Sequence, residues 1–178
     1  RDGDEQRAAV AWVELSTGRF SAALLELSQL NDELARIGLR ELLYVESADG
    51  VTPSRIDELI RTANCVATAR PAWQFRQDEA IETLRRQFQV ATLQGFGFDD
   101  DDPMLGPAGA VIHYLLETQR TSDGKQAHRI AHLRPPQRFK RDGHLVIDHV
   151  SLRSLEVERT IRSGETRGTL VGVLEDCV

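Results

Sequence analysis

Hydrophobic positions in the early part of the chain fall into short runs separated by turn residues. Residues 8–15 and 19–27 are two apolar runs joined by a polar turn, in which Gly18 can adopt a positive φ. This pattern predicts a β-hairpin. Residues 41–46 and 65–69 are shorter apolar runs bounded by turn residues, and they predict two further strands, the first of them buried.

Between these strands, apolar residues recur at the spacing of a helix. The sequence predicts a short helix that begins after an N-cap at Ser28 and ends at Gly38 in the left-handed conformation. A second helix is expected to begin with Thr52 as N-cap and Pro53 at its first position. The apolar positions are Leu30, Leu34 and Ile37 in the first helix and Ile56, Leu59, Ile60 and Ala63 in the second.

Two longer helical patterns follow. Residues 77–89 carry a narrow apolar stripe, and Trp73 and Phe75 are expected to anchor the connection before it. Residues 104–119 carry a broad apolar surface, with Asp102–Pro103 suited to cap the helix, and this breadth predicts burial against more than one neighbour. The alternation of strands and helices predicts an α/β domain.

The domain organisation follows from the turn-rich segments. Residues 1–7 are charged and predict a disordered start, and residues 121–125 are polar and predict a hinge. We therefore expect one domain over 8–124 and the beginning of another over 125–178, which has too little apolar surface to close a core alone. In that last part the pattern predicts a strand over 144–148 and a helix over 150–157.

Charge and cysteine content narrow the class of protein. The 178 residues include 22 Lys and Arg against 28 Asp and Glu, a net charge of −6, which argues against a domain that clamps duplex phosphates by bulk charge. Cys65 and Cys177 lie too far apart to form a dense disulfide framework, so we expect free thiols in a reducing compartment. No apolar run is long enough to cross a membrane.

The sequence predicts no active site. His128 and His132 have the spacing of one helix turn but lack further metal ligands. The glycines of residues 164–169 and 95–97 do not match a phosphate-binding loop or a dinucleotide fingerprint. Residues 99–102 are consecutive aspartates without the spacing of a calcium loop, and we expect them to form a solvated loop that caps the following helix.

Three strings of residues carry a family likeness. They are AWVELSTGRF at 11–20, RPAWQF at 70–75 and LQGFGF at 93–98, and in this order they resemble the connector domain of the MutS family of DNA mismatch repair proteins. The likeness continues through AGAVIHYLLETQR at 108–120 and covers residues 8–178.

This resemblance implies an RNase H-like connector domain, with a mixed sheet flanked by helices, followed by an incomplete and mainly helical segment that begins the core or lever domain. The connector of this family links the mismatch-reading domain, the lever helices and the ATPase, and it docks MutL. The resemblance assigns no catalytic, metal-binding or cofactor-binding residue to this chain. ATP and magnesium, mismatched DNA and the second MutS subunit would be bound by the intact parent, a cytoplasmic, nucleoid-associated protein without membrane contact.

The polar face of the helix at 77–89 is the surface that we expect to be exposed for docking. It is made of Glu82, Arg85, Arg86 and Gln89.

Two departures from the family pattern leave an alternative open. Residues 153–156 read RSLE where the family has RNLE, and residues 168–170 read GTL where the family has NTL. The connector of a MutS paralogue that does not act in repair is therefore the alternative within the family.

An RNase H-like nuclease is a second alternative. Such an enzyme needs several carboxylates that converge on two metal ions, and the candidates are Glu14, Asp49 and Asp148. Their surroundings favour strand-end and surface positions.

A direct nucleic-acid interface is a third alternative. Arg134, Arg138, Lys140 and Arg141 form a basic group with Phe139 among them. The net acidity of the chain favours a solvated loop between domains instead.

Overall fold

A β-hairpin is the centre of the fold. Strands β1 (Arg7–Glu14) and β2 (Arg19–Glu26) are antiparallel along their whole length, from the pair Arg7 and Glu26 to the pair Glu14 and Arg19. Gly18 closes the turn with φ of +69°, as predicted, and a side chain there would collide with the carbonyl oxygen of His132. The turn therefore requires glycine for both its conformation and its surroundings.

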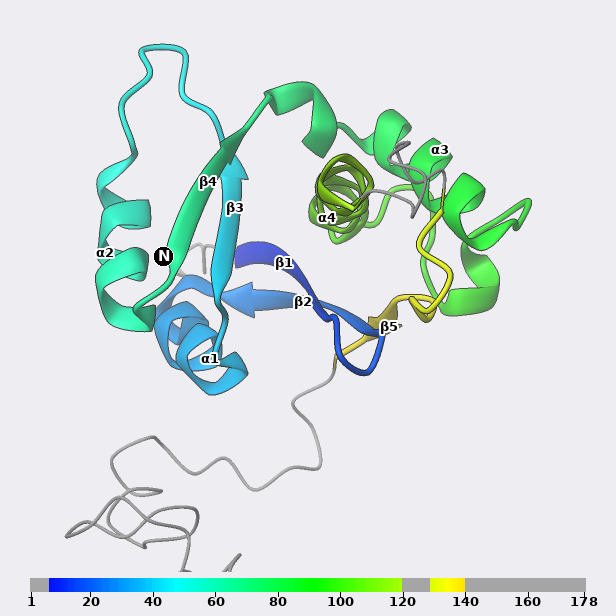
Figure 1. The fold of residues 1–178 in the computed structure, drawn as a ribbon, viewed down its shortest axis with the longest axis horizontal. Coiled ribbons are helices and arrows are strands. Elements are labelled where there is room, and N and C mark those ends of the chain that lie inside the picture. Colours follow the sequence, from blue (N-terminus) through cyan, green and yellow to red (C-terminus); the bar gives the residue numbers. More distant parts are fainter. Residues whose placement is uncertain (1–6, 120–128, 140–178) are drawn as a thin grey trace, which may run out of the picture.

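The computed structural model describes residues 7–119 and 129–139 (Figure 1). The predicted strand at 144–148, the predicted helix at 150–157 and the glycines at 164–169 lie outside these residues. After the hairpin the described elements are η1 (Leu27–Gln29), α1 (Leu30–Ile37), β3 (Glu41–Val45), α2 (Ser54–Ala63), β4 (Val66–Arg70), η2 (Ala72–Phe75), α3 (Gln77–Phe88), η3 (Gln94–Phe96), α4 (Leu105–Thr118) and β5 (Gln137–Arg138).

The described strands form two small sheets. β5 extends the hairpin by pairing parallel to β2. β3 pairs parallel to β4, and the crossover helix α2 connects these two strands. The architecture is a mixed α/β fold, as the alternation of patterns predicted.

Both faces of the hairpin are covered by hydrophobic residues. In a strand, side chains alternate between the two faces, so one hairpin can contribute to two cores. Figure 1 shows α3 and α4 on one side of the hairpin and the elements α1 to β4 on the other. The first core receives Ala9, Ala11, Val13, Phe20 and Ala22, and the second receives Ala8, Val10, Trp12, Ala23 and Leu25.

The two long helices of the first core approach each other closely. Leu84 of α3 and Ile112 of α4 are fully buried, and α4 has glycine at positions 106 and 109. A Cβ atom at Gly109 would lie 2.5 Å from the Cα and Cβ atoms of Ala80 on α3. The absence of a side chain therefore sets the distance between the two helices.

Residues 129–139, which the sequence analysis assigned to the following domain, pack into these same cores. The buried side chain of Gln87 accepts a hydrogen bond from the Ile130 amide (3.0 Å) and donates one to the Ile130 carbonyl (2.9 Å). Ile130 and Leu133 are buried in the first core, and the Phe139 amide donates to the Ala22 carbonyl at 2.8 Å.

Phe139 belongs to the second core. Its ring lies edge-on to Trp12, with 5.5 Å between the ring centroids, and the guanidinium of Arg36 lies over it at 4.9 Å. The end of the described chain is therefore tied to both strands of the hairpin.

Within the described residues, the observed helices and strands confirm the predicted ones, with shifts at several ends. α4 begins at Leu105 after Met104, and not after an N-cap at Asp102. Ser28 is not an N-cap, because η1 comes first and α1 begins at Leu30. Pro53 rather than Thr52 precedes α2, and β4 begins at Val66. β3 is only half-buried, and its first and last residues, Glu41 and Val45, are exposed.

The connection before α3 is also different from the prediction. Trp73 is 46% exposed, whereas Gln74 is buried, because the tight turn of η2 directs Gln74 inward to polar partners. Gln74 is buried because its amide has hydrogen-bond partners there, although the neighbouring Trp73 is more hydrophobic.

Substitution of Gly109 tests the close approach of the helices. We expect Gly109→Ala to lower the free energy of unfolding by about 1–2 kcal/mol, since the clash with Ala80 outweighs the better helix propensity of alanine. Urea unfolding followed by circular dichroism measures this change. Gly95→Ala is the matched control, because a Cβ atom there meets nothing within 4 Å. Equal stabilities of the two variants would contradict this account.

Candidate docking surface

The predicted docking residues lie along one face of α3. Glu82 and Arg86 are both exposed, and the Arg86 guanidinium donates to the Glu82 carboxylate at 2.9 Å across one helix turn. Exposed pairs of this kind contribute little stability, so both groups are free to exchange partners. The described residues provide no other hydrogen bond or ion pair to these two side chains.

The other two predicted residues have structural roles in the domain. Arg85 is half-buried and contacts both carboxylate oxygens of Asp100 at 3.2 and 3.3 Å. Gln89 ends α3 in the left-handed conformation, with φ of +56°, and its side chain accepts a hydrogen bond from Arg129 at 2.6 Å. The structure therefore brings the four residues together on one face but engages Arg85 and Gln89 in tertiary contacts.

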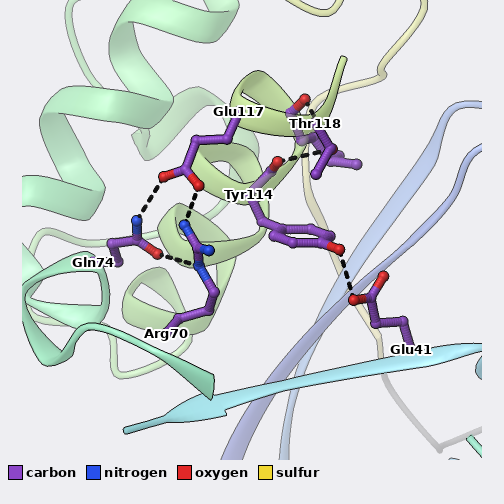
Figure 2. Close-up of polar contacts among 7 residues, drawn as sticks. Glu41, Arg70, Gln74, Tyr114, Glu117 and Thr118 are labelled. Atoms are coloured by element: carbon purple, nitrogen blue, oxygen red, sulfur yellow. Dashed lines mark hydrogen bonds and ion pairs between the residues drawn. The ribbon is translucent and has the colours of Figure 1, made fainter. Parts of the chain in front are cut away.

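A second group of polar residues joins α4 to the parallel strands (Figure 2). Gln74 is 1% exposed; its side chain accepts a hydrogen bond from Arg70 Nε at 3.0 Å and donates one to Glu117 Oε1 at 3.0 Å. Arg70 also forms an ion pair with Glu117. The three residues come from η2, β4 and α4, and each buried polar group has a partner.

Tyr114 extends this network to β3. Its hydroxyl donates to Glu41 Oε1 at 2.6 Å, and the Thr68 hydroxyl donates to the same oxygen at 2.5 Å. The hydrogen bond to Glu41, together with burial and the negative charge of that carboxylate, raises the pKa of Tyr114 above its ordinary value. The guanidinium of Arg70 lies 5.4 Å from the centre of the Tyr114 ring.

The predicted solvated aspartate loop is wrong at Asp102. This residue is 6% exposed; its carboxylate accepts the Met104 amide at 3.1 Å before α4 begins, and it pairs with Arg138. Arg138 also donates to the Gly97 carbonyl at 2.6 Å and lies over the ring of Phe98. Arg138, a member of the predicted basic group, is therefore a partner of the buried Asp102 carboxylate.

Of the remaining basic residues of that group, the structure describes Arg134 alone. Arg134 is exposed, and its amide donates to the Gly18 carbonyl. Lys140 and Arg141 lie outside the described residues.

Of the carboxylates of the nuclease alternative, the two that the structure describes lie in separate parts of the fold. Glu14 is exposed at the end of β1 and accepts a hydrogen bond from Thr17, whereas Asp49 lies in the loop after β3 and accepts from Ser47 and the Val51 amide. Asp148 is outside the described residues. Within residues 7–119 and 129–139, no group of three or more His, Cys, Asp and Glu residues is arranged to hold a metal ion.

The histidine and cysteine predictions fall partly outside the described chain. His132 is exposed, whereas His128 and Cys177 are not described. Cys65 is a free thiol, and burial raises its pKa above the ordinary value. No helix in the described segments is long and apolar enough to span a bilayer.

The network around Gln74 was not predicted from the sequence. Its signals were a glutamine inside the string RPAWQF and the polar residues Tyr114 and Glu117 near the end of the mainly apolar helix α4. A polar residue within a broad apolar face predicts a buried partner, but it does not identify that partner.

Comparison with known proteins identifies relatives of the chain. The family model described as MutS domain II matches residues 1–130. The chain is 42% identical over 170 residues to the DNA mismatch repair protein MutS of Rhodopirellula baltica, covering 95% of this chain and 18% of that protein. It is 34% identical over 176 residues to the MutS of Anaeromyxobacter dehalogenans (98% and 19%) and 30% identical over 173 residues to that of Salinibacter ruber (97% and 18%). The chain thus spans about a fifth of the length of these relatives.

Alkaline titration tests the bond between Tyr114 and Glu41. Because folding raises the pKa of Tyr114, its contribution to stability is complete below the unfolded value of about 10 and is lost as the pH rises through the higher folded value. Absorbance at the tyrosinate band should show one late transition in the folded protein.

We expect Tyr114→Phe to remove this late transition and Glu41→Gln to move it to lower pH, because the charged acceptor is lost. Tyr44→Phe is the control and should keep it. A late transition that persists without Tyr114 would contradict the assigned hydrogen bond.

Proposed function

Because the chain belongs to the MutS family and matches its domain II, we propose that it is the non-catalytic connector of a DNA mismatch repair protein. In this role it couples the mismatch-binding and ATPase domains of the whole protein and docks MutL. Other parts of that protein bind ATP, magnesium and mismatched DNA. The whole protein also associates with a second MutS subunit, and it acts in the cytoplasm at the nucleoid.

The observation that carries the coupling role is the position of β2. β1 is the first described strand and β5 is the last. Both form hydrogen bonds with β2, which lies between them. Both hydrophobic cores pack on the same strands. Because packed interiors repack as a unit instead of deforming continuously, a displacement at either end of the domain is transmitted to both cores.

The docking role is supported by the exposed pair on α3. Glu82 and Arg86 offer charges of both signs on a helix that is anchored on its other side by Leu84 and Gln87. Exposed charges on a rigid element favour electrostatic complementarity and fast association with a partner. MutL is the partner that the family relationship suggests.

We also infer an RNase H-like topology and a domain boundary beyond residue 139. An antiparallel hairpin followed by parallel strands and crossover helices supports the first inference. The burial of Ile130 and Leu133 and the pairing of β5 with β2 support the second.

A calorimetric titration at physiological salt tests the docking role. The 178-residue chain and the N-terminal domain of the cognate MutL should bind with 1:1 stoichiometry. We expect Arg86→Glu and Glu82→Lys each to weaken binding about tenfold, roughly 1.4 kcal/mol, because each reverses a charge on the docking face. Arg61→Glu, on the exposed side of α2, is the matched control and should bind as the original chain does.

The outcomes separate the parts of the proposal. Binding that is unchanged in both α3 variants would move the docking site away from this face. A folded chain that does not bind MutL at all would overturn the docking role and favour a MutS paralogue that acts outside repair.

A further inference from the structure

Residues 129–139, which we call the strap, lie against both the hairpin and α3. Figure 1 shows this segment in yellow, running from the side of α3 to β5 at the hairpin. The side chains of Ile130 and Leu133 are 2% and 6% exposed and belong to the first core. Between the strap and the hairpin turn, the Arg134 amide donates to the Gly18 carbonyl at 2.8 Å. The strap therefore packs on elements that come much earlier in the chain.

Polar bonds hold the two ends of the strap. At the first end, the buried side-chain amide of Gln87 binds both the amide and the carbonyl of Ile130, at 3.0 and 2.9 Å. At the other end, Arg138 pairs with the buried carboxylate of Asp102 and donates to the Gly97 carbonyl at 2.6 Å. If one end left alone, a buried amide or carboxylate would lose its partner, which is costly. A partly detached strap is therefore unfavourable.

Two consecutive prolines, Pro135 and Pro136, join the two ends of the strap. Proline restricts its own φ to about −65° and holds the residue before it extended, so this part of the backbone is stiff. Pro136 is also fully buried, which leaves the linker little room to rearrange. Because the connection between Leu133 and β5 is stiff, a displacement of one end of the strap moves the other end.

The rest of the domain keeps its own contacts when the strap is absent. β1 and β2 pair along all eight residues of each strand, whereas β5 pairs with β2 through two residues. Apart from the two strap residues, the buried members of the first core lie between Phe20 and Leu115. A segment with few main-chain bonds opens at a lower free energy than a fully paired hairpin. The strap is therefore the part of this core that can leave first.

We propose that the strap detaches as one unit while the hairpin, α3 and α4 stay folded, and that it acts as a two-state conformational switch. The chain continues from Phe139 into residues 140–178, and Gln87 lies in the last turn of α3. A displacement at Phe139 therefore reaches α3 in a single step. The switch belongs to the domain alone and needs no partner, so the proposal goes beyond the connector and docking roles. Its failure would leave the calorimetric test of docking unaffected.

Hydrogen exchange of the ¹⁵N-labelled 178-residue chain, followed by nuclear magnetic resonance, tests the proposal. The amides of Ile130, Arg134 and Phe139 each donate to an acceptor outside the strap. Their protection factors should agree within about twofold and lie at least about tenfold below those of the β1 amides that pair with β2. Strap amides as protected as those of β1 would overturn the proposal, because the strap would then open only with the whole domain. Unprotected strap amides would also overturn it, because the docked state would be missing.

A variant at the first end separates one opening unit from several independent contacts. Gln87→Ala removes both bonds to Ile130, and we expect it to lower the protection of Arg134 and Phe139 about tenfold, although the acceptors of these two amides are unchanged. Gln94→Ala makes the same substitution at an exposed position and should leave all strap amides as they were. A loss of protection confined to Ile130 would mean that the contacts open separately, and the proposal would be wrong.

A variant at the other end makes the reciprocal test, which also holds if Gln87→Ala does not fold. Arg138→Lys keeps the charge but loses the planar guanidinium that binds two acceptors at once. We expect it to lower the protection of Ile130 and Arg134 about fivefold. Arg61→Lys, on the exposed side of α2, is the matched control and should have no effect on these amides. Unchanged protection of Ile130 in Arg138→Lys would contradict a single unit.

Discussion

The burial of both faces of one hairpin is the constraint on which this domain depends. β1 and β2 contribute alternate residues to two hydrophobic cores, so neither core is complete without the hairpin. A sheet with one solvated face would need only one layer of helices. Here the hairpin requires α3 and α4 on one side and α1, α2 and β3 on the other, and the arrangement of the remaining elements follows from this requirement.

The join between the two halves is chemically different from the cores. α4 contacts the parallel strands through Arg70, Gln74, Tyr114 and Glu117, and Gln74 has almost no exposed surface. Buried hydrogen bonds must be made in full or leave costly unpaired groups. The network therefore fixes one relative position of α4 and the strands.

Periodicity predicted the local structure of the described residues well, because hairpins and amphipathic helices are encoded by nearby residues. Gly18 and Gly38 were identified as left-handed positions, and Glu82 and Arg86 as exposed, from spacing alone. The contacts of Arg85 with Asp100 and of Asp102 with Arg138 join distant parts of the chain. Such partners are set by tertiary packing, so no local pattern could distinguish these charged residues from solvated ones.

Alanine is frequent on both faces of the hairpin, as Ala8, Ala9, Ala11, Ala22 and Ala23 show. Because these side chains are small, the helices on both sides can pack close to the backbone of the hairpin. Close packing limits the substitutions that each face of the hairpin accepts. A larger side chain at one position must be offset by a smaller side chain that packs against it on the same face. During evolution, each side of this hairpin is therefore expected to change together with its own helices and independently of the other side.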